Sequence, residues 1–511
     1  MLKAKIDQSP WTGSNSAHPI ILCWKDELKN KQMEGCKAFF PKLEALLEAN
    51  KFKGAEDSLC VITHVGDDLK VRHFFFVGLG KELPEKHENA ERLRRAVCFA
   101  IKKAKALCAK ELFLEFQNTD PFGLSGHDLL SQIVVCAKMA DYGFSEFKSK
   151  DKDENGKTPE NSELELVIFI ENLDTNLAQN ALEKAQIIGD SVNWARYLAD
   201  MPPNIATPEF VAAKAEQAAR ECGLETNIFG PARAKELGMG GFMAVQAGSE
   251  FDGQFIELEY KSGIPGAKKI AIVGKGVTFD SGGVSLKPAN YMKGMKYDMS
   301  GAAAVIATIL AISKLKPEVD VVALAPMVEN MPGGGSCRQD DVITHYNGMT
   351  TEIENTDAEG RLILADALSY AEKKHKPDII IDLATLTGAC VVALGHFFSG
   401  LMSNDQKLAG ELLEHGKTSG DWLWQLPLHP FYKNGIKSNI ADLTNSGSAS
   451  YGAGSITAGK FLECFVGQTP WAHIDIAGTE NAIPDSAYAD KLSSGVGVRL
   501  LVEFILAQNR K

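Results

Sequence analysis

The chain has 511 residues, of which 45% are hydrophobic and 23% charged, and its formal net charge at pH 7 is -12. This length exceeds one ordinary hydrophobic core, so we expect two domains in a soluble globular protein. Because the net charge is negative, the protein has no overall positive potential that would attract nucleic acid or anionic lipid, and binding of either is disfavoured. A local basic patch is still compatible with the negative net charge.

The N-terminal sequence, the lengths of the apolar runs and the cysteines predict a cytoplasmic protein without membrane association. The first ten residues, MLKAKIDQSP, lack the apolar core of a secretory signal. No uninterrupted apolar run approaches the roughly 20 residues of a membrane-spanning helix. The ten cysteines form no C-x-x-C pair, and most lie in apolar surroundings, as Cys60, Cys98, Cys136 and Cys390 do. This pattern favours reduced core thiols over a disulfide framework or a thiolate zinc site.

The first part of the chain alternates strand and helix patterns, which predicts an N-terminal α/β domain over residues 1–175. The helix is expected at Glu88–Leu107, and the strands are expected at Pro19–Trp24, Leu59–His64, Val71–Gly78 and Leu164–Ile170. Residues 147–163 are rich in Lys, Asp and Glu. They form either a linker or, as we favour, an exposed loop inside this domain.

A long helix follows at Asn176–Asp200, and the sequence Met201-Pro202-Pro203-Asn204 ends it. Proline stops a helix and biases the preceding residue toward extended geometry. We therefore expect residues 176–204 to form a connecting helix and linker, with a C-terminal domain over residues 205–511.

The C-terminal domain again has an α/β pattern, which predicts a mixed sheet flanked by helices. Strands are expected at Lys269–Val273, Val319–Ala325, Asp378–Leu383 and Trp471–Ile476, and helices at Gly301–Leu315, Gly360–His375 and Thr457–Phe465. Several polar motifs fall where a strand ends. Ligands of open α/β sheets bind at the carboxyl ends of the strands.

The motif NTDAEGRL at residues 355–362 carries two carboxylates and a cation. Asp357 and Glu359 could simply favour the N-terminal end of the following helix dipole. Arg361 opposes that dipole, which suggests that it faces nearby negative charge or an anion. The two-residue spacing also directs both carboxylates to one side in extended backbone.

A glycine-rich stretch, VGKGVTFDSGG at residues 273–283, adds Lys275 and Asp280. A phosphate-binding loop is an alternative, but neither the G-x-G-x-x-G nor the Walker spacing is present. Asp298 could be an ordinary helix cap, and Lys287 an ordinary solvated lysine.

Taken together, Asp280, Asp298, Asp357 and Glu359 would place four negative charges in one pocket. Their repulsion in a partly dry site is prohibitive unless cations neutralise it. Two divalent ions would do so, and oxygen donors favour Mg, Mn or Zn over copper. The sequence therefore predicts a metallohydrolase.

These motifs closely resemble the leucyl aminopeptidase family, the cytosolic two-metal aminopeptidases of peptidase family M17. The resemblance covers about residues 190–505 and rests on the stretches at 273–283, 297–303, 355–362, 382–388 (DLATLTG) and 471–478 (WAHIDIAG), with MPPN at 201–204. It implies an N-terminal α/β domain, a connecting helix and a catalytic α/β domain. It also implies a homohexamer.

The resemblance implies a role for each matching residue. Lys275, Asp280, Asp298 and Glu359 would hold one exchangeable metal, and Asp280, Asp357 and Glu359 the other. Both ions would be Zn or Mn, with Mg or Co as alternatives in one site.

Lys287 and Arg361 match the family's catalytic side chains, and Arg361 would hold a bicarbonate anion that moves the proton. Thr385, Leu386 and Gly388 would bind the peptide.

The function so implied is hydrolysis of N-terminal residues, leucine-like ones preferred, from peptides with a free N-terminus by a two-metal-activated water. Three alternatives stay open at this point: a non-catalytic scaffold on the same fold, an enzyme that also binds nucleic acid, and a metallophosphatase. Retention of all the matching residues disfavours the first alternative. The lack of histidine ligands disfavours the last.

Overall fold

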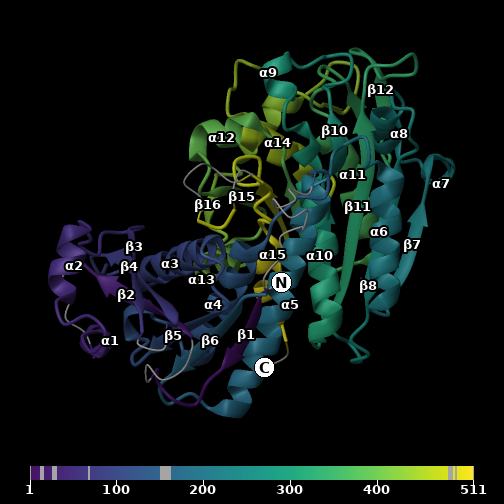
Figure 1. The fold of residues 1–511 in the computed structure, drawn as a ribbon. Coiled ribbons are helices and arrows are strands. Elements are labelled where there is room, and N and C mark those ends of the chain that lie inside the picture. The colour runs from purple at the N-terminus through teal and green to yellow at the C-terminus, as the bar shows by residue number, and fades with distance from the viewer. Residues whose placement is uncertain are drawn as a thin grey trace. The chain divides into compact units, whose positions relative to one another are not determined.

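The computed structural model describes residues 2–11, 17–25, 31–66, 69–149, 163–481, 487–489 and 492–509. The chain divides into two compact units (Figure 1). The first unit comprises Met1–Asp190 with Asp485–Asp490, and the second Ser191–Pro484 with Lys491–Lys511. Each unit contains a sheet with helices, so the expected α/β fold class is confirmed. The domain limits at residues 175 and 204 stay a prediction.

The first unit is built on a six-stranded sheet in the order β1-β6-β5-β2-β4-β3. Its neighbouring strands are parallel except β3 and β4, which are antiparallel. The strands are β1 (Lys3–Ile6), β2 (His18–Trp24), β3 (Leu59–Val65), β4 (Val71–Gly80), β5 (Glu111–Phe116) and β6 (Glu165–Ile170). Strands were predicted for four of these, β2, β3, β4 and β6, and all four are confirmed.

The helices of the first unit are α1 (Lys31–Cys36), α2 (Leu43–Ala49), α3 (Lys86–Ala106), the 3-10 turn η1 (Asp120–Phe122), α4 (Gly126–Asp141) and most of α5 (Thr175–Asp200). The predictions for α3 and α5 are confirmed. Buried aromatic residues Phe74, Phe75 and Phe76 alternate across both faces of β4, so both faces of this strand are covered. Most of the predicted loop at 147–163 lies outside the described residues.

The second unit contains a mixed nine-stranded sheet, in the order β16-β15-β18-β14-β9-β11-β8-β7 with β10 beside β11. The central strands β18, β14, β9, β11 and β10 are mutually parallel, and β7, β8 and β15 run antiparallel to their inner neighbours. The bounds are β7 (Glu225–Phe229), β8 (Gln254–Tyr260), β9 (Lys269–Gly274), β10 (Gly276–Asp280), β11 (Asp320–Asn330), β14 (Ile379–Ala384), β15 (Ser399–Ser403), β16 (Leu423–Gln425) and β18 (Trp471–Asp475).

A smaller sheet joins β12 (Val342–Thr344), β13 (Thr350–Glu352) and β17 (Leu443–Thr444). The helices of the second unit are α6 (Pro208–Glu221), α7 (Pro231–Glu236), α8 (Gly240–Gln246), α9 (Ala289–Met292), α10 (Ser300–Leu315), α11 (Gly360–Tyr370), α12 (Gly388–Leu394), α13 (Gln406–Ser419), α14 (Gly454–Glu463) and α15 (Val498–Ala507). Two 3-10 helices, η2 (Met295–Met299) and η4 (Pro430–Ile436), complete it, together with the π-helix η3 (Ala371–His375), which continues α11.

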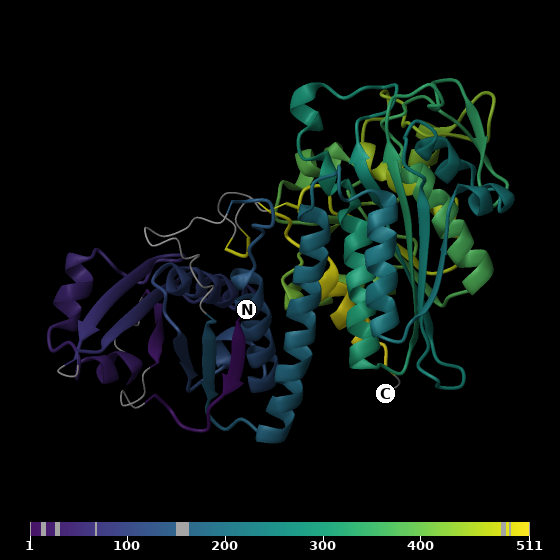
Figure 2. The ribbon, with the colours of Figure 1, turned by 45° about the vertical axis from the view of Figure 1, so that its right-hand side comes forward.

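Helices cover both faces of the large sheet (Figure 2). Helices α6 and α10 pack on the strands from one side, while α8 and α11 belong to the apolar core on the other. The segment Met295–Leu315 has the length and hydropathy of a membrane span, yet 89% of its most apolar window is buried inside the fold. An apolar helix buried in this way is typical of the core of a soluble protein.

Parallel strands bring the polar motifs to one edge of the large sheet. Strands β9, β10, β11, β14 and β18 all end there, at or just before Lys275, Asp280, Asn330, Thr385 and Asp475. Helix α11 begins beside the same edge, directly after Glu359. The fold thus gathers residues that lie up to two hundred positions apart.

Strand β11 is longer than predicted and reaches Asn330 instead of Ala325. Pro326 cannot donate a backbone hydrogen bond to a neighbouring strand. In the structure, β9 pairs with β11 only as far as Leu324, and β10 begins its pairing at Met327. Pro326 falls between these two pairings, so the strand continues past it.

The far end of α11 is fixed by Glu257, a buried carboxylate on β8. It accepts hydrogen bonds from Asn227 Nδ2 at 2.7 Å, Tyr370 Oη at 2.9 Å and Lys374 Nζ at 2.7 Å, and His375 Nε2 lies 3.0 Å away. Burial alone raises the pKa of Glu257, but His375, Lys374 and Asn227 more than offset it and lower the pKa to about 2.

We predict that Glu257→Gln lowers the free energy of unfolding at pH 7 by about 3 kcal/mol, because the folded pKa lies well below the unfolded one. The contribution is complete above the unfolded pKa, near 4.5, and is lost as the pH falls towards about 2. Urea unfolding of wild type and variant should therefore converge in acid. Glu259→Gln is the matched control, since its ion-pair partners Lys269 and Lys261 lie 3.8 and 3.9 Å away. Equal stabilities at pH 7 would contradict this role.

Candidate metal centre

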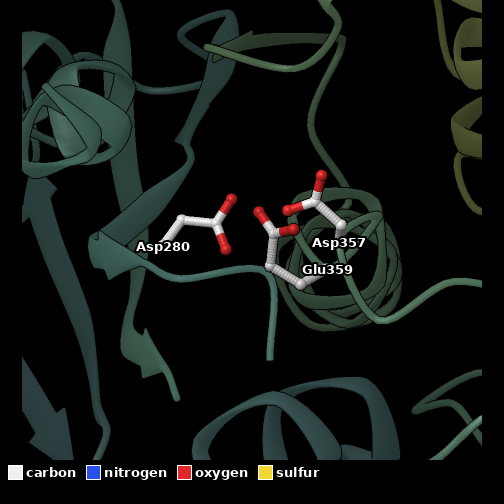
Figure 3. A group of neighbouring side chains, drawn as sticks. All are labelled: Asp280, Asp357 and Glu359. Carbon is white, nitrogen blue, oxygen red and sulfur yellow. The ribbon is translucent and has the colours of Figure 1, made fainter. Parts of the chain in front are cut away.

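Three carboxylates meet at the strand edge. Asp280 ends β10, Asp357 lies in the turn before α11, and Glu359 is the N-cap residue of that helix. One oxygen of each lies within 4.8 Å of the others, and the three side chains point toward a common space (Figure 3). Asp280 and Glu359 are each only 2% exposed, so little water separates their charges.

Lys275 joins the fourth predicted acid, Asp298, to this group. Its Nζ donates to Asp298 Oδ1 at 2.7 Å and to the Thr385 carbonyl oxygen at 2.9 Å. The same nitrogen lies 2.9 Å from Glu359 Oε1, an ion pair outside hydrogen-bond geometry. Gly360 makes this approach possible, because a Cβ there would lie 2.4 Å from Lys275 Cε.

Lys287 approaches the other side of the acid group. Its Nζ forms ion pairs with Asp280 Oδ2 at 2.8 Å and with Asp357 Oδ1 at 2.6 Å. The structure therefore brings together all five predicted metal ligands and one predicted catalytic lysine. Asn330, which the sequence analysis missed, fixes Asp280 by donating from Nδ2 to Oδ1 at 2.8 Å. The strand was predicted to end at Ala325, so Asn330 was not placed at the edge of the sheet. A correct length for β11 would have placed Asn330 there.

The carboxylates destabilise one another in their ionised form. Burial raises the pKa of Asp280 and of Asp298, and Glu359 raises both further. Burial also raises the pKa of Asp357, with a contribution from Asp280. Burial alone would lower the pKa of Lys275, but Asp298 and Glu359 overcome this effect and raise it. Lys275 is thus held as an ammonium, and it can ligate a metal only when a cation among the acids displaces its proton.

The donor set fits divalent cations. Among the described residues, Asp298 Oδ2 is buried and accepts no hydrogen bond, while the buried atoms Asp357 Oδ1 and Glu359 Oε1 each face a lysine ammonium. Four acids face only two ammonium groups, so negative charge remains in excess when all are ionised. Hard cations prefer carboxylate oxygens, and they would offset this excess charge.

Arg361 lies in the first turn of α11 and is only 8% exposed. Within the described part of the chain, its Nε and Nη1 atoms donate no hydrogen bond. Burial lowers the pKa of the guanidinium to about 10, while Glu359 and Asp475 act in the opposite direction. At neutral pH the group stays protonated, so it offers buried N–H donors to an anion.

The predicted peptide-binding residues follow β14. Thr385 Oγ1 donates to Asp298 Oδ1 at 2.6 Å, and Leu386 N donates to Asp475 Oδ1 at 3.2 Å. Gly388 begins α12 in open space. Thr385 therefore lies directly beside Asp298, and Asp475 orients the backbone at Leu386.

The chain matches the model of the cytosol aminopeptidase family, catalytic domain, over residues 193–502, and that of the family's N-terminal domain over residues 20–151. A probable cytosol aminopeptidase of Chlorobium limicola is 44% identical over 423 residues, which cover 81% of this chain and 82% of that protein. One from a Geobacter species is 38% identical over 487 residues, 95% of this chain and 96% of that protein.

Solved structures agree with this assignment. A mutant of tomato leucine aminopeptidase superimposes with a TM-score of 0.88 at 30% identity, covering 99% of this chain and 97% of that one. The bottromycin maturation enzyme BotP in complex with Mn gives a TM-score of 0.80 at 31% identity, covering 91% of this chain and 96% of that one. The aminopeptidase interpretation is confirmed over the scaffold and phosphatase alternatives, and the chain belongs to the cytosol aminopeptidase family of metal-dependent aminopeptidases.

Proposed function

We propose that this enzyme removes N-terminal residues from peptides with a free N-terminus, leucine-like residues preferred, and that it acts in the cytoplasm. The observation that carries the proposal is the convergence of four acids and two lysines beside an open peptide-binding segment. Leucine preference is supported by the similarity to tomato leucine aminopeptidase. The cytoplasmic location is supported by the names of the relatives.

Two divalent ions, Zn or Mn with Mg or Co as alternatives in one site, are proposed as cofactors. Lys275, Asp280, Asp298 and Glu359 would hold one ion, and Asp280, Asp357 and Glu359 the other. The complex of BotP with Mn supports manganese as a candidate. Such a pair of ions supplies an activated water and polarises the scissile carbonyl.

The chain's own residues provide the remaining chemistry. Ions bound by Asp280 and Asp357 would compete with Lys287 for the same oxygens, which leaves its ammonium for the substrate. Burial alone lowers the pKa of Lys287, but Asp280 and Glu359 overcome this effect and raise it, so the group stays charged and can stabilise a developing oxyanion. Arg361 would hold a bicarbonate anion through its free N–H donors. Thr385, Leu386 and Gly388 would bind and orient the peptide backbone.

A homohexamer, which the family resemblance implies, is also proposed, and large aromatic side chains of the second unit that reach solvent are candidates for its interfaces. Trp424 is 59% exposed on the edge strand β16, and its ring packs edge-on against Phe398 at a centroid distance of 6.0 Å. Exposed apolar patches of this kind mark interaction surfaces.

Metal removal tests the chemistry. A chelator should abolish cleavage of leucine anilide, and Zn or Mn should restore it. Glu359→Gln should bind less metal, measured by elemental analysis, and lose roughly 100-fold or more in kcat, because a charged bridging ligand is gone. Glu354→Gln, an exposed site five residues upstream, is the matched control. Cleavage that persists without metal would refute the mechanism.

The close approach of Lys275 to Gly360 predicts a second effect. Gly360→Ala places a methyl group 2.8 Å from Lys275 Nζ, so metal content and kcat/KM should both fall, by roughly tenfold or more. Gly410→Ala on α13 meets nothing within 4 Å and should stabilise the protein by about 0.5–1 kcal/mol instead. Equal metal content in the two variants would show that the packing around Lys275 is unimportant.

Assembly is tested by Trp424→Asp, which places a charge in the exposed aromatic patch. We expect a smaller particle mass than wild type in light scattering after size exclusion. Leu177→Asp, at a position 56% exposed in the first unit, is the control and should leave the mass unchanged. A monomeric wild type would refute the hexamer directly.

A further inference from the structure

Glu480 is an acid that the proposed mechanism does not use. It follows β18 in a turn closed by its own N–H donating to the Ile476 carbonyl oxygen at 3.1 Å. Its Oε1 accepts from Asn481 Nδ2 at 3.2 Å, whereas its Oε2 is buried and accepts no hydrogen bond from the described residues. The side chain as a whole keeps part of its surface exposed.

A second free acceptor lies next to it. The Oδ1 atom of Asn481 is also buried and without a donor among the residues that the structure describes. A buried acceptor without a partner costs about 1–3 kcal/mol, so two adjacent ones would be stabilised by the donor groups of a bound molecule.

Glu480 lies beside the peptide-binding segment. It interacts electrostatically with Asp475, whose Oδ1 holds Leu386 N at 3.2 Å. The same Asp475 Oδ1 also accepts from Ala477 N at 3.2 Å. The turn that carries Glu480 is therefore tied to Leu386 through one carboxylate, and it forms the wall beside that segment.

The two acids of this wall, Asp475 and Glu480, favour a positively charged donor. Asp475 and Glu480 are both acids, and burial followed by the repulsion of Asp475 raises the pKa of Glu480 to about 8. A cation near Oε2 would be attracted by Asp475 and would stabilise the ionised form of Glu480, whereas an apolar side chain would leave the free acceptors unsatisfied.

We propose that Glu480 is a specificity-determining residue that accepts the cationic end of an N-terminal lysine or arginine of the peptide. This inference rests on the proposed function and extends its substrate range from leucine-like to basic residues. The ammonium or guanidinium would donate to Glu480 Oε2, with Asn481 Oδ1 as a second acceptor.

The test compares lysine anilide with norleucine anilide, which has the same chain length but no side-chain ammonium. We expect Glu480→Gln to lower the ratio of their kcat/KM values by roughly tenfold or more. Glu480→Leu should lower it further. Glu414→Gln, on the exposed face of α13, is the matched control and should keep the wild-type ratio.

The ratio separates this inference from the function on which it rests. If wild type cleaves neither anilide with metal present, the proposed function fails. If wild type cleaves them but the ratio is the same in wild type, Glu480→Gln and Glu480→Leu, only the role of Glu480 is overturned. A ratio that falls in both Glu480 variants and not in Glu414→Gln supports it, whatever the absolute rates.

Discussion

The mutual repulsion of four carboxylates, three of them buried and one half-buried, is the constraint on which this centre depends. Little water can screen Asp280, Asp298 and Glu359 from one another and from Asp357, and the two lysine ammonium groups offset only part of their charge. The raised pKa values of three of these acids report the remaining cost. Bound cations relieve the repulsion between the carboxylates, so the same repulsion gives the site a high affinity for cations. The metal dependence therefore follows from the side chains of the site.

The fold creates this crowding by two means. Parallel central strands deliver their carboxyl ends to one edge, and glycines allow the backbone to approach where any side chain would collide. A Cβ on Gly301 would lie 2.2 Å from the Leu383 carbonyl oxygen, and one on Gly360 would lie 2.4 Å from Lys275 Cε. The starts of α10 and α11 can therefore reach the strand ends, and they bring Asp298 and Glu359 with them.

The sequence was sufficient to predict the acids because they occur in short motifs. It did not predict residues whose role depends on contacts between segments that are distant in the chain. Asp357 and Glu359 occur in one octapeptide, and the family resemblance linked them to Lys275 and Asp280. Asn330 was missed because the strand was predicted to end at Ala325, whereas β11 continues along β10, which pairs with it from Met327 to Asn330. Glu257 has no motif at all, since its partners come from β7, the end of α11 and η3.

The same electrostatic reasoning separates the metal centre from the wall at Glu480. Divalent ions require several carboxylate oxygens at once, and Asp280, Asp357 and Glu359 supply them within 4.8 Å. Glu480 stands outside that group with a pKa near 8, so at neutral pH it is mostly protonated and is a poor competitor for a metal. A single positive side chain can still shift it to the ionised form, because one cation stabilises one carboxylate. With the proposed roles, one acidic region would hold the metal and the other a basic residue, without exchange between them.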